Sequence, residues 1–273
     1  MAADDKDLLA PWRIKIDEID QQLLELLAKR AEAALEVGKI KHQLNAPIFR
    51  PDRERQVIDG LIDRNKSPLA PEGIASIWRE IMSACRALEA PVRVAYLGPA
   101  GTFSEQAAFA QFGQSIGRVP CSTIDEVFRA VDAGAADYGV VPVENSSEGA
   151  ISRTLDLLLD TDLKVTGEVA LPIHHHLLSK SGKLEGVTKV CAHAQALAQC
   201  QRWLANNAPH LERQAVSSNG EAARLAASDP TVAAIAGDAA QQEYALQAVQ
   251  SLIQDDPHNR TRFVVISHGS CQP

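Results

Sequence analysis

Two polar stretches, far apart in the sequence, carry side chains that could bind a small anion. The first, residues 144–147 (ENSS), follows a β-branched apolar run at residues 138–143 and precedes an amphipathic helix expected from about Ile151. The apolar run is too short for a helix and predicts a buried strand. Ligands bind at the carboxyl ends of strands in open α/β sheets, and a helix N-terminus offers unpaired N–H donors to an anion. An ordinary strand–helix loop is the alternative for these residues taken alone.

The second polar stretch is residues 259–262 (NRTR), which precedes the apolar sequence FVVI. Thr261 would place a hydroxyl at the start of a strand, but no adjacent His–Asp pair supports a hydrolase triad. Three consecutive histidines at residues 174–176 could suggest a metal site. Because successive strand residues point to alternate faces, three adjacent histidines rarely share one ion, and we expect no metal. The glycine-rich loop at residues 98–106 lacks the spacing of a nucleotide-binding motif.

A third group of charged side chains falls on the apolar faces of helices expected in the first ninety residues. Apolar residues follow helical spacing from about Leu8 to Leu44, and Arg30 and Lys41 lie on the same stripe. Charges on an apolar face are costly unless they are paired or used. Snorkelling side chains and interhelical salt bridges are the alternative. We expect the three helices to bring the whole set of charged side chains to one interior, and the set comprises Arg13, Arg30, Lys41, Arg53, Glu54 and Glu89.

The helices that must position this set predict an all-α domain over residues 1–90. A first helix over residues 8–44 would be roughly 55 Å long at 1.5 Å per residue, which is longer than a ninety-residue monomer needs. We therefore expect this helix to extend past its own domain and to pack against another chain. The second helix is expected to begin at Pro51, because proline suits the first helical turn. The third is expected to follow Pro71 and to end near Glu89.

The remainder of the chain, residues 91–273, alternates between strands and helices and predicts an α/β domain. The first set of elements is a strand at residues 92–98, a helix from Ser104, a strand near Val119 and a helix opened by a capping box at residues 122–125. The second set is a strand at residues 188–192, a helix over residues 196–206, a strand near Ala215, a helix from Glu221 and a strand at residues 232–236. Two such sets suggest two lobes with a ligand-binding cleft between them.

The composition excludes several classes of protein. The chain has 273 residues, is 45% hydrophobic and carries a net charge of −8, which argues against nucleic acid as a partner. An anionic substrate must then be captured by local cations that act against the overall field. The N-terminus does not resemble a signal peptide, and no apolar run reaches the roughly 18 residues that span a membrane. Five cysteines without CxxC or metal-like spacing indicate reduced thiols, so we expect a cytoplasmic protein.

The first ninety residues also resemble a known enzyme family. The sequences RIKIDEIDQQLLELLAKR, EVGKIK and RPDRER are similar to the all-helical class of chorismate mutase over about residues 8–90. The resemblance implies an intertwined dimer whose long first helices cross, with Arg13 serving the partner's site. It also implies that Glu89 lies beside the ether oxygen of chorismate.

The chemistry of the mutase reaction fits the residue types that the resemblance implies. An intramolecular rearrangement needs no nucleophile or general base, so the protein must hold a dianion in a compact conformer and stabilise developing charge. Arg13 and Arg30 suit the two carboxylates, because a guanidinium pairs with a carboxylate bidentately. Lys41 suits the ether oxygen as a point charge. Glu54 would accept a hydrogen bond from the ring hydroxyl, oriented by Arg53.

The rest of the chain resembles prephenate dehydratase. The sequences GPAGTFSEQAA, DYGVVPVENSSEGAI, HAQALAQC and NRTRF occur in this order within residues 92–268. The resemblance implies a two-lobed fold like that of type II periplasmic binding proteins, with Thr261 as the essential catalytic hydroxyl and Arg262 as a substrate-binding cation. Ala192 and Ala194 depart from the family's usual SHPQ motif. The further residues implied to line the cleft are Thr102, Ser104, Asn145, Ser146, Thr154 and Gln199.

These resemblances predict a bifunctional enzyme of phenylalanine biosynthesis, which rearranges chorismate to prephenate and then decarboxylates and dehydrates prephenate to phenylpyruvate. No cofactor is expected, because aromatisation supplies the driving force. The alternatives are an arogenate dehydratase with a mutase domain, and a ligand-binding sensor with a helical dimerisation arm. Enzymes resembling this one usually carry a C-terminal ACT domain of about eighty residues that binds phenylalanine, and the sequence to Pro273 leaves no room for it. We therefore expect either a fragment or an enzyme that phenylalanine does not inhibit.

Overall fold

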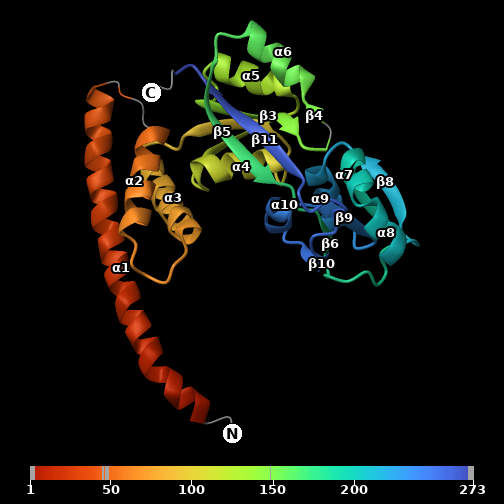
Figure 1. Cartoon of the computed structure of the whole chain (residues 1–273), viewed down its shortest axis with the longest axis horizontal. Helices are drawn as coiled ribbons and strands as arrows, with labels where there is room; N and C mark the ends of the chain where they lie inside the picture. Colours follow the sequence, from red (N-terminus) through yellow and green to blue (C-terminus); the bar gives the residue numbers. More distant parts are fainter. Residues whose placement is uncertain (1–3, 45, 47–48, 148, 270–273) are drawn as a thin grey trace. The chain divides into compact units, whose positions relative to one another are not determined.

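The computed structural model describes residues 4–44, 46, 49–147 and 149–269, and the chain divides into two compact units. Unit 1 comprises Met1–Val92 with Gly113–Ser115, and unit 2 comprises Arg93–Phe112 with Ile116–Pro273. Unit 1 is helical, whereas unit 2 contains two β-sheets with helices on their faces (Figure 1). This arrangement confirms the expected fold class of an all-α region followed by a two-lobed α/β region.

The described helices of unit 1 are α1 (Asp4–Gln43), α2 (Pro51–Arg64) and α3 (Pro71–Ala87). Both α2 and α3 begin at a proline, whose fixed φ suits the first turn and whose missing N–H is not needed there. α1 begins earlier than expected, so Pro11 lies inside it. Apolar side chains along α1 are exposed, among them Ile16 at 55%, Leu23 at 51% and Leu26 at 60%. The described residues of one chain therefore leave the apolar stripe of α1 largely uncovered.

The first sheet of unit 2, sheet A, is built from β1 (Arg93–Leu97), β2 (Gly117–Cys121), β3 (Tyr138–Asn145), β4 (Gly149–Ala150), β5 (Lys164–Pro172) and β11 (Arg260–Ser267). Its order is β2-β1-β3-β11-β5, with β4 paired to β3. β1, β2 and β3 are parallel, whereas β11 runs antiparallel between β3 and β5. The helices α4 (Phe103–Phe112) and α5 (Ile124–Asp132) cover opposite faces, and α6 (Ser152–Asp160) packs beside α5 (Figure 1). The position of β11 brings the two polar stretches of the sequence side by side.

The second sheet, sheet B, is built from β6 (His176–Ser179), β7 (Lys189–His193), β8 (Glu212–Val216), β9 (Val232–Ala236) and β10 (Gln247–Gln250), in the order β10-β6-β9-β7-β8. Successive residues of β7 point to opposite faces of the sheet. Val190 packs in a cluster with α7 (Ala194–Gln199) and α8 (Gln201–Asn207). Cys191 packs in a second cluster with α9 (Asn219–Ser228) and α10 (Asp238–Glu243). Each sheet is thus enclosed by helices on both faces.

Several local expectations need correction. The helix expected over residues 196–206 is two helices, because the backbone at Cys200 leaves the helical region. The N-cap of α5 is Thr123 rather than Ser122, since the Thr123 side chain accepts a hydrogen bond from the Glu126 N–H. The strands β5, β6 and β10 and the helix α10 were not anticipated from the sequence. None of the described helices is both long and apolar enough to cross a membrane.

Candidate active sites

A cavity of about 1100 Å³ lies between the two lobes of unit 2. Its walls come from both lobes, since β11 and the loop before α4 belong to the lobe of sheet A and α7 belongs to the lobe of sheet B. The residues that the sequence analysis placed around this cleft and that line the cavity are Thr102, Ser104, Asn145, Gln199 and Thr261. The tertiary fold therefore gathers side chains that are up to 159 positions apart, from Thr102 to Thr261.

The hydroxyl of Thr261 is oriented by Asn145. The two residues are directly opposite each other in the antiparallel pairing of β11 with β3. The Ser147 N–H donates to Asn145 Oδ1 at 2.9 Å, which leaves Asn145 Nδ2 to donate to Thr261 Oγ1 at 2.8 Å. Because Thr261 Oγ1 already accepts this hydrogen bond, its own proton is available to a ligand. Thr261 and Asn145 are each 8% exposed, so water competes little for these groups.

A second set of hydrogen bonds links this pair of strands to the other lobe through Asn259. Ser146 Oγ accepts from the Arg260 N–H at 3.0 Å and donates to Asn259 Oδ1 at 3.2 Å. Asn259 Nδ2 then donates to Gln199 Oε1 at 3.0 Å. The sequence analysis did not name Asn259, although it lies within the NRTR stretch. Ser146 was expected in the cleft, but it does not line the cavity and instead holds Asn259 and the start of β11.

Two further expected residues do not line the cavity. Thr154 is fully buried, and its hydroxyl donates to the Pro142 carbonyl at 2.7 Å. Arg262 is exposed, and its guanidinium pairs with Glu144 at 2.9 Å and Glu168 at 2.8 Å. Adjacent strand residues point to opposite faces of a sheet. Because the Thr261 side chain points toward the cavity, the Arg262 side chain must point away from it. Arg262 therefore does not line the cavity, and its role in binding the substrate stays a prediction.

The described residues that line the cavity include no lysine or arginine. The expectation that local cations capture the anion is therefore wrong for this cavity. Its donors are hydroxyl and amide groups and the first turns of α4 and α9, where backbone N–H groups lack intrahelical partners. Ser104 contributes to the wall at the first turn of α4, and Ser218 and Asn219 contribute at the start of α9. Helix N-termini can hold a carboxylate without a formal positive charge.

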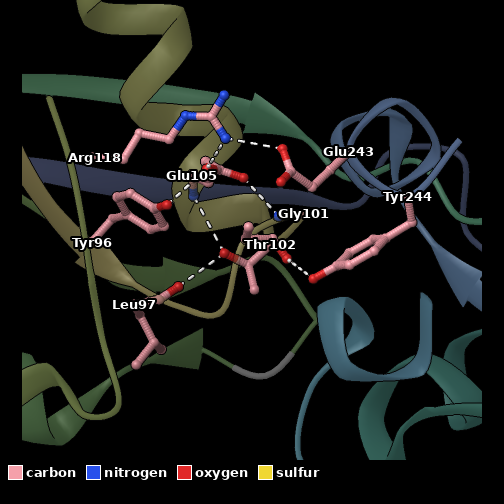
Figure 2. Close-up of polar contacts among 9 residues, drawn as sticks. Tyr96, Leu97, Gly101, Thr102, Glu105, Arg118, Glu243 and Tyr244 are labelled. Atoms are coloured by element: carbon pink, nitrogen blue, oxygen red, sulfur yellow. Dashed lines mark hydrogen bonds and ion pairs between the residues drawn. The ribbon is translucent and has the colours of Figure 1, made fainter. Parts of the chain in front are cut away.

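A buried carboxylate, Glu105, fixes the loop that carries Thr102 (Figure 2). Glu105 is 1% exposed; its Oε2 accepts from the Gly101 N–H at 2.6 Å and its Oε1 from the Tyr96 hydroxyl at 2.7 Å. Burial and the neighbouring Glu105 raise the pKa of Tyr96, which keeps the phenol protonated as a donor. The Thr102 hydroxyl itself donates to the Leu97 carbonyl at 2.8 Å. Thr102 therefore shapes the wall of the cavity while its proton is already engaged.

The same cluster joins the two lobes. Arg118 contacts Glu105 at 3.4 Å within its own lobe and pairs with Glu243 of α10 at 2.9 Å across the lobes (Figure 2). The Tyr244 hydroxyl donates to the Ala100 carbonyl at 3.1 Å. Sequence reasoning missed this cluster, and its available signal was a glutamate within the otherwise uncharged stretch GPAGTFSEQAA.

His175 is a further cavity residue that the sequence analysis did not select. Its Nε2 lies 2.9 Å from Gln199 Oε1, and the Phe103 ring packs edge-on against the imidazole with centroids 5.5 Å apart. Burial lowers the pKa of His175, with a smaller opposing effect from its hydrogen bond to Gln199. Among the described residues, no group of three or more His, Cys, Asp or Glu side chains is arranged to hold a metal ion.

In unit 1, the carboxylate of Glu54 pairs with Arg86. The Arg86 side chain is 6% exposed, and its guanidinium lies over the Phe49 ring at 4.7 Å from the centroid. Burial raises the pKa of Glu54, and the charges of Arg86, Arg79 and Lys41 oppose this shift. Arg53 was expected to orient Glu54, but the Arg53 side chain is exposed. The guanidinium that donates a hydrogen bond to Glu54 is that of Arg86. Residues adjacent on a helix do not face each other, whereas α2 and α3 pack together.

Glu89 lies against α1 beside Gly38. Gly38 is buried, and a Cβ at that position would overlap the Glu89 side chain. Lys41 follows Gly38 by one turn of α1, and both Lys41 and Glu89 are half-buried. Glu89 Oε2 is buried and has no hydrogen-bond partner among the described residues. The structure thus brings Glu89, Lys41 and Glu54 into one region of unit 1, since Lys41 also acts on the pKa of Glu54.

Arg13 cannot reach this region within its own chain. Arg13 and Lys41 lie on the same helix, α1, and their separation along its axis is about 42 Å at 1.5 Å per residue. Arg13 is exposed, whereas Arg30 is half-buried and lies about 16 Å along the axis from Lys41. Arginine side chains span only a few ångströms, so Arg13 requires a second chain to join the other charged residues.

Comparisons with known proteins agree with this division of the chain. Residues 12–90 match chorismate mutase type II, and residues 94–271 match prephenate dehydratase. The chain is 48% identical over 275 residues to a bifunctional chorismate mutase/prephenate dehydratase from Pseudomonas aeruginosa, covering 98% of this chain and 75% of the relative. A protein of the same description from Neisseria gonorrhoeae is 51% identical over 265 residues, covering 96% of this chain and 73% of the relative.

A solved structure supports the fold of unit 2. The prephenate dehydratase from Arthrobacter aurescens, in complex with L-Phe, is 32% identical with a TM-score of 0.62, and the match covers 67% of this chain and 62% of that one. The folds and the family matches define a class of enzyme that combines a helical mutase region with a two-lobed dehydratase region. The chain belongs to the bifunctional chorismate mutase/prephenate dehydratase family. The expected pair of activities is thereby confirmed, and neither the arogenate dehydratase nor the sensor alternative is favoured.

Proposed function

We propose that unit 1 rearranges chorismate to prephenate, and that the cavity of unit 2 converts prephenate to phenylpyruvate with Thr261 as the donor to the leaving hydroxyl. The observation that carries the proposal is the hydrogen bond from Asn145 Nδ2 to Thr261 Oγ1, because it directs the Thr261 proton to a ligand. We assign the mutase to residues 1–90 and the dehydratase to residues 91–273. Free cysteines among the described residues support the expected cytoplasmic location.

In the dehydratase step, the ring C–O bond and the bond to the carboxylate both break. The electrons of the carboxylate bond enter the ring as carbon dioxide leaves, and the ring becomes aromatic as the hydroxyl departs with its bonding pair. A hydrogen bond from Thr261 stabilises the negative charge that grows on the departing oxygen. The hydroxide takes up one proton from the solvent and is released as water. The carboxylates of prephenate are assigned to the N–H groups at the starts of α4 and α9. No cofactor is required, because aromatisation drives the reaction.

In the mutase step, the protein holds the dianion in the compact conformer and places donors at the ether oxygen. Arg30 and Arg13 are assigned to the two carboxylates of chorismate, with Arg13 supplied by the partner chain. Lys41 and Glu89 are assigned to the ether oxygen. Glu54 accepts a hydrogen bond from the ring hydroxyl, and its orientation is assigned to Arg86.

The homodimer is part of this proposal. The exposed apolar stripe of α1 and the axial separation of Arg13 from Lys41 support an arrangement in which each site takes Arg13 from the other chain. Arg13→Ala and Lys41→Ala should each be inactive as mutases. When the two are unfolded, mixed in equal amounts and refolded together, about one quarter of the sites should be intact, because half of the dimers are hybrid and each hybrid holds one complete site. An inactive mixture that contains hybrid dimers would contradict the shared site.

The separation of the two activities tests the assignments. Lys41→Ala should abolish mutase turnover and leave dehydratase turnover near that of the unmodified chain, and Thr261→Ala should do the reverse. Chorismate consumption and phenylpyruvate formation from prephenate are measured on the same preparations. Loss of both reactions in either folded variant would refute the two-site assignment.

A further inference from the structure

Two residues in the wall of the unit 2 cavity each carry a buried polar atom that has no hydrogen-bond partner among the described residues. They are His175 Nδ1 and Gln199 Nε2. Both residues line the cavity, and His175 is 2% exposed. Buried polar atoms are normally satisfied, so an unpartnered pair on residues of the cavity wall is available to a polar group of a ligand. The two residues already contact each other through His175 Nε2 and Gln199 Oε1, so their unpartnered atoms belong to one small region.

The hydrogen-bond network decides which of these atoms donates and which accepts. Asn259 Oδ1 accepts from the hydroxyls of Ser146 and Ser147, so Asn259 Nδ2 must be the donor to Gln199. The Gln199 atom that faces Asn259 is therefore its oxygen, and the free atom is an N–H donor. His175 Nε2 must carry a proton to donate to the same oxygen. In the neutral imidazole, which burial favours, Nδ1 is then a bare acceptor.

The position of His175 is firmly held. Its backbone N–H donates to Gln254 Oε1 at 3.1 Å, and its carbonyl accepts from the Ile253 N–H at 2.8 Å. The Phe103 ring meets the imidazole at 75°, which limits rotation of the ring. The acceptor therefore has a fixed direction before any ligand arrives, as a preorganised site requires.

Three groups on residues that line the cavity match one chemical group in the kinds of hydrogen bond they can make. Thr261 offers an O–H donor, Gln199 offers an N–H donor, and His175 offers an acceptor. A hydroxyl has two lone pairs and one proton, so it complements this set, whereas a carboxylate is acceptor-only and would face the His175 lone pair unfavourably. The ring hydroxyl is the sole hydrogen-bond donor on the prephenate dianion.

We propose that His175 is a substrate-contacting residue of the dehydratase, whose Nδ1 accepts a hydrogen bond from the ring hydroxyl of prephenate. This inference rests on the proposed function of the cavity. With its proton held by His175, the hydroxyl directs its lone pairs at Gln199 Nε2 and Thr261 Oγ1. The two donors then stabilise the charge that develops as the C–O bond breaks. His175 selects the orientation of the leaving group and transfers no proton.

Two matched substitutions separate contact with the substrate from structural support. In His175→Asn, the side-chain oxygen can occupy the position of Nδ1 and keep the acceptor, but the link to Gln199 is lost. In His175→Gln, the longer amide can restore the link to Gln199, but the acceptor at the Nδ1 position is lost. We expect dehydratase kcat to fall about 100-fold for His175→Gln and no more than about 10-fold for His175→Asn. The opposite order, or equal losses, would overturn the proposal.

A ligand without the hydroxyl provides the control. Phenylpyruvate lacks the ring hydroxyl, so its dissociation constant should be unchanged in both His175 variants. Weaker phenylpyruvate binding that accounts for the lost activity would show a structural role and refute the inference. Mutase turnover on the same preparations should stay at the level of the unmodified chain.

The outcome for Thr261→Ala distinguishes failure of this inference from failure of the proposed function. If Thr261→Ala retains dehydratase turnover, the proposed function of the cavity is wrong. If Thr261→Ala is inactive and His175→Gln is fully active, the inference alone is wrong. Should a His175 variant unfold, inactive Thr261→Ala labelled with 15N-histidine replaces it. Prephenate, but not phenylpyruvate, should shift the His175 Nδ1 resonance, and an unshifted resonance in saturating prephenate would overturn the proposal.

Discussion

The ion pair between Glu54 and Arg86 makes a quantitative prediction about the stability of unit 1. Arg86→Met keeps the apolar stem of the side chain and removes its charge. Glu54, whose side chain is 20% exposed, then loses this partner. Removing one partner of a buried pair costs about 3–5 kcal/mol. The protein can limit this cost by protonating Glu54, which requires about 3–4 kcal/mol at pH 7, because each pH unit above the ordinary pKa of a glutamate costs about 1.4 kcal/mol.

The burial of Glu54 and its pairing with Arg86 also determine how the lost stability depends on pH. Burial already raises the pKa of Glu54, and Arg86 is the largest opposing influence, so Arg86→Met should raise this pKa further. A carboxyl whose pKa is raised in the folded state leaves stability intact below its unfolded pKa and reduces it as pH rises toward the folded pKa. The loss caused by Arg86→Met should therefore be about 1 kcal/mol or less near pH 4.5 and about 3 kcal/mol near pH 7.

Urea unfolding of the full chain at fixed concentration, followed at several pH values, measures this difference. The matched control is the double variant Glu54→Gln/Arg86→Met, in which no charge is left behind and most of the lost stability should return. A loss for Arg86→Met that is the same at pH 4.5 and pH 7 would refute the reasoning. So would a double variant no more stable than Arg86→Met alone.

Three further predictions follow from single contacts. Gly38→Ala should displace the Glu89 side chain and lower mutase kcat at least about 10-fold. This loss is expected although alanine stabilises a helix by up to about 1 kcal/mol relative to glycine. An unchanged kcat would show that Glu89 is not part of the mutase site. Glu105→Gln replaces one of the two acceptor oxygens with an amide N–H, which then faces the Tyr96 hydroxyl or the Gly101 N–H, both of which are donors. We expect this change to cost about 1–3 kcal/mol of stability and to raise the dehydratase KM. Mutase turnover serves as the unaffected control. Mutase kcat/KM should fall as pH drops through the raised pKa of Glu54, because Glu54 must be ionised to accept the hydrogen bond. Glu54→Gln should remove this fall in kcat/KM at acidic pH. If the fall persists in Glu54→Gln, another group causes it.

Local patterns in the sequence were sufficient for much of the fold. The strand at residues 138–143, the strand at residues 232–236 and the helix that begins at Pro51 follow from apolar periodicity and from the residues that end or begin elements, since these effects act within a few residues. The same alternation could have predicted that Arg262 does not line the cavity. If Thr261 faces the ligand, the next residue of the strand must face away.

The partners of the charged and polar side chains were decided by tertiary structure. Glu54 is adjacent to Arg53 in the sequence, yet it pairs with Arg86 of another helix, because the packing of α2 against α3 determines which side chains share an interior. His175 and Gln199 carry no motif that joins them, and their hydrogen bond exists because β6 and α7 meet in one lobe. Sequence periodicity fixes the face on which a side chain lies, whereas its partner depends on which faces the long-range packing brings together.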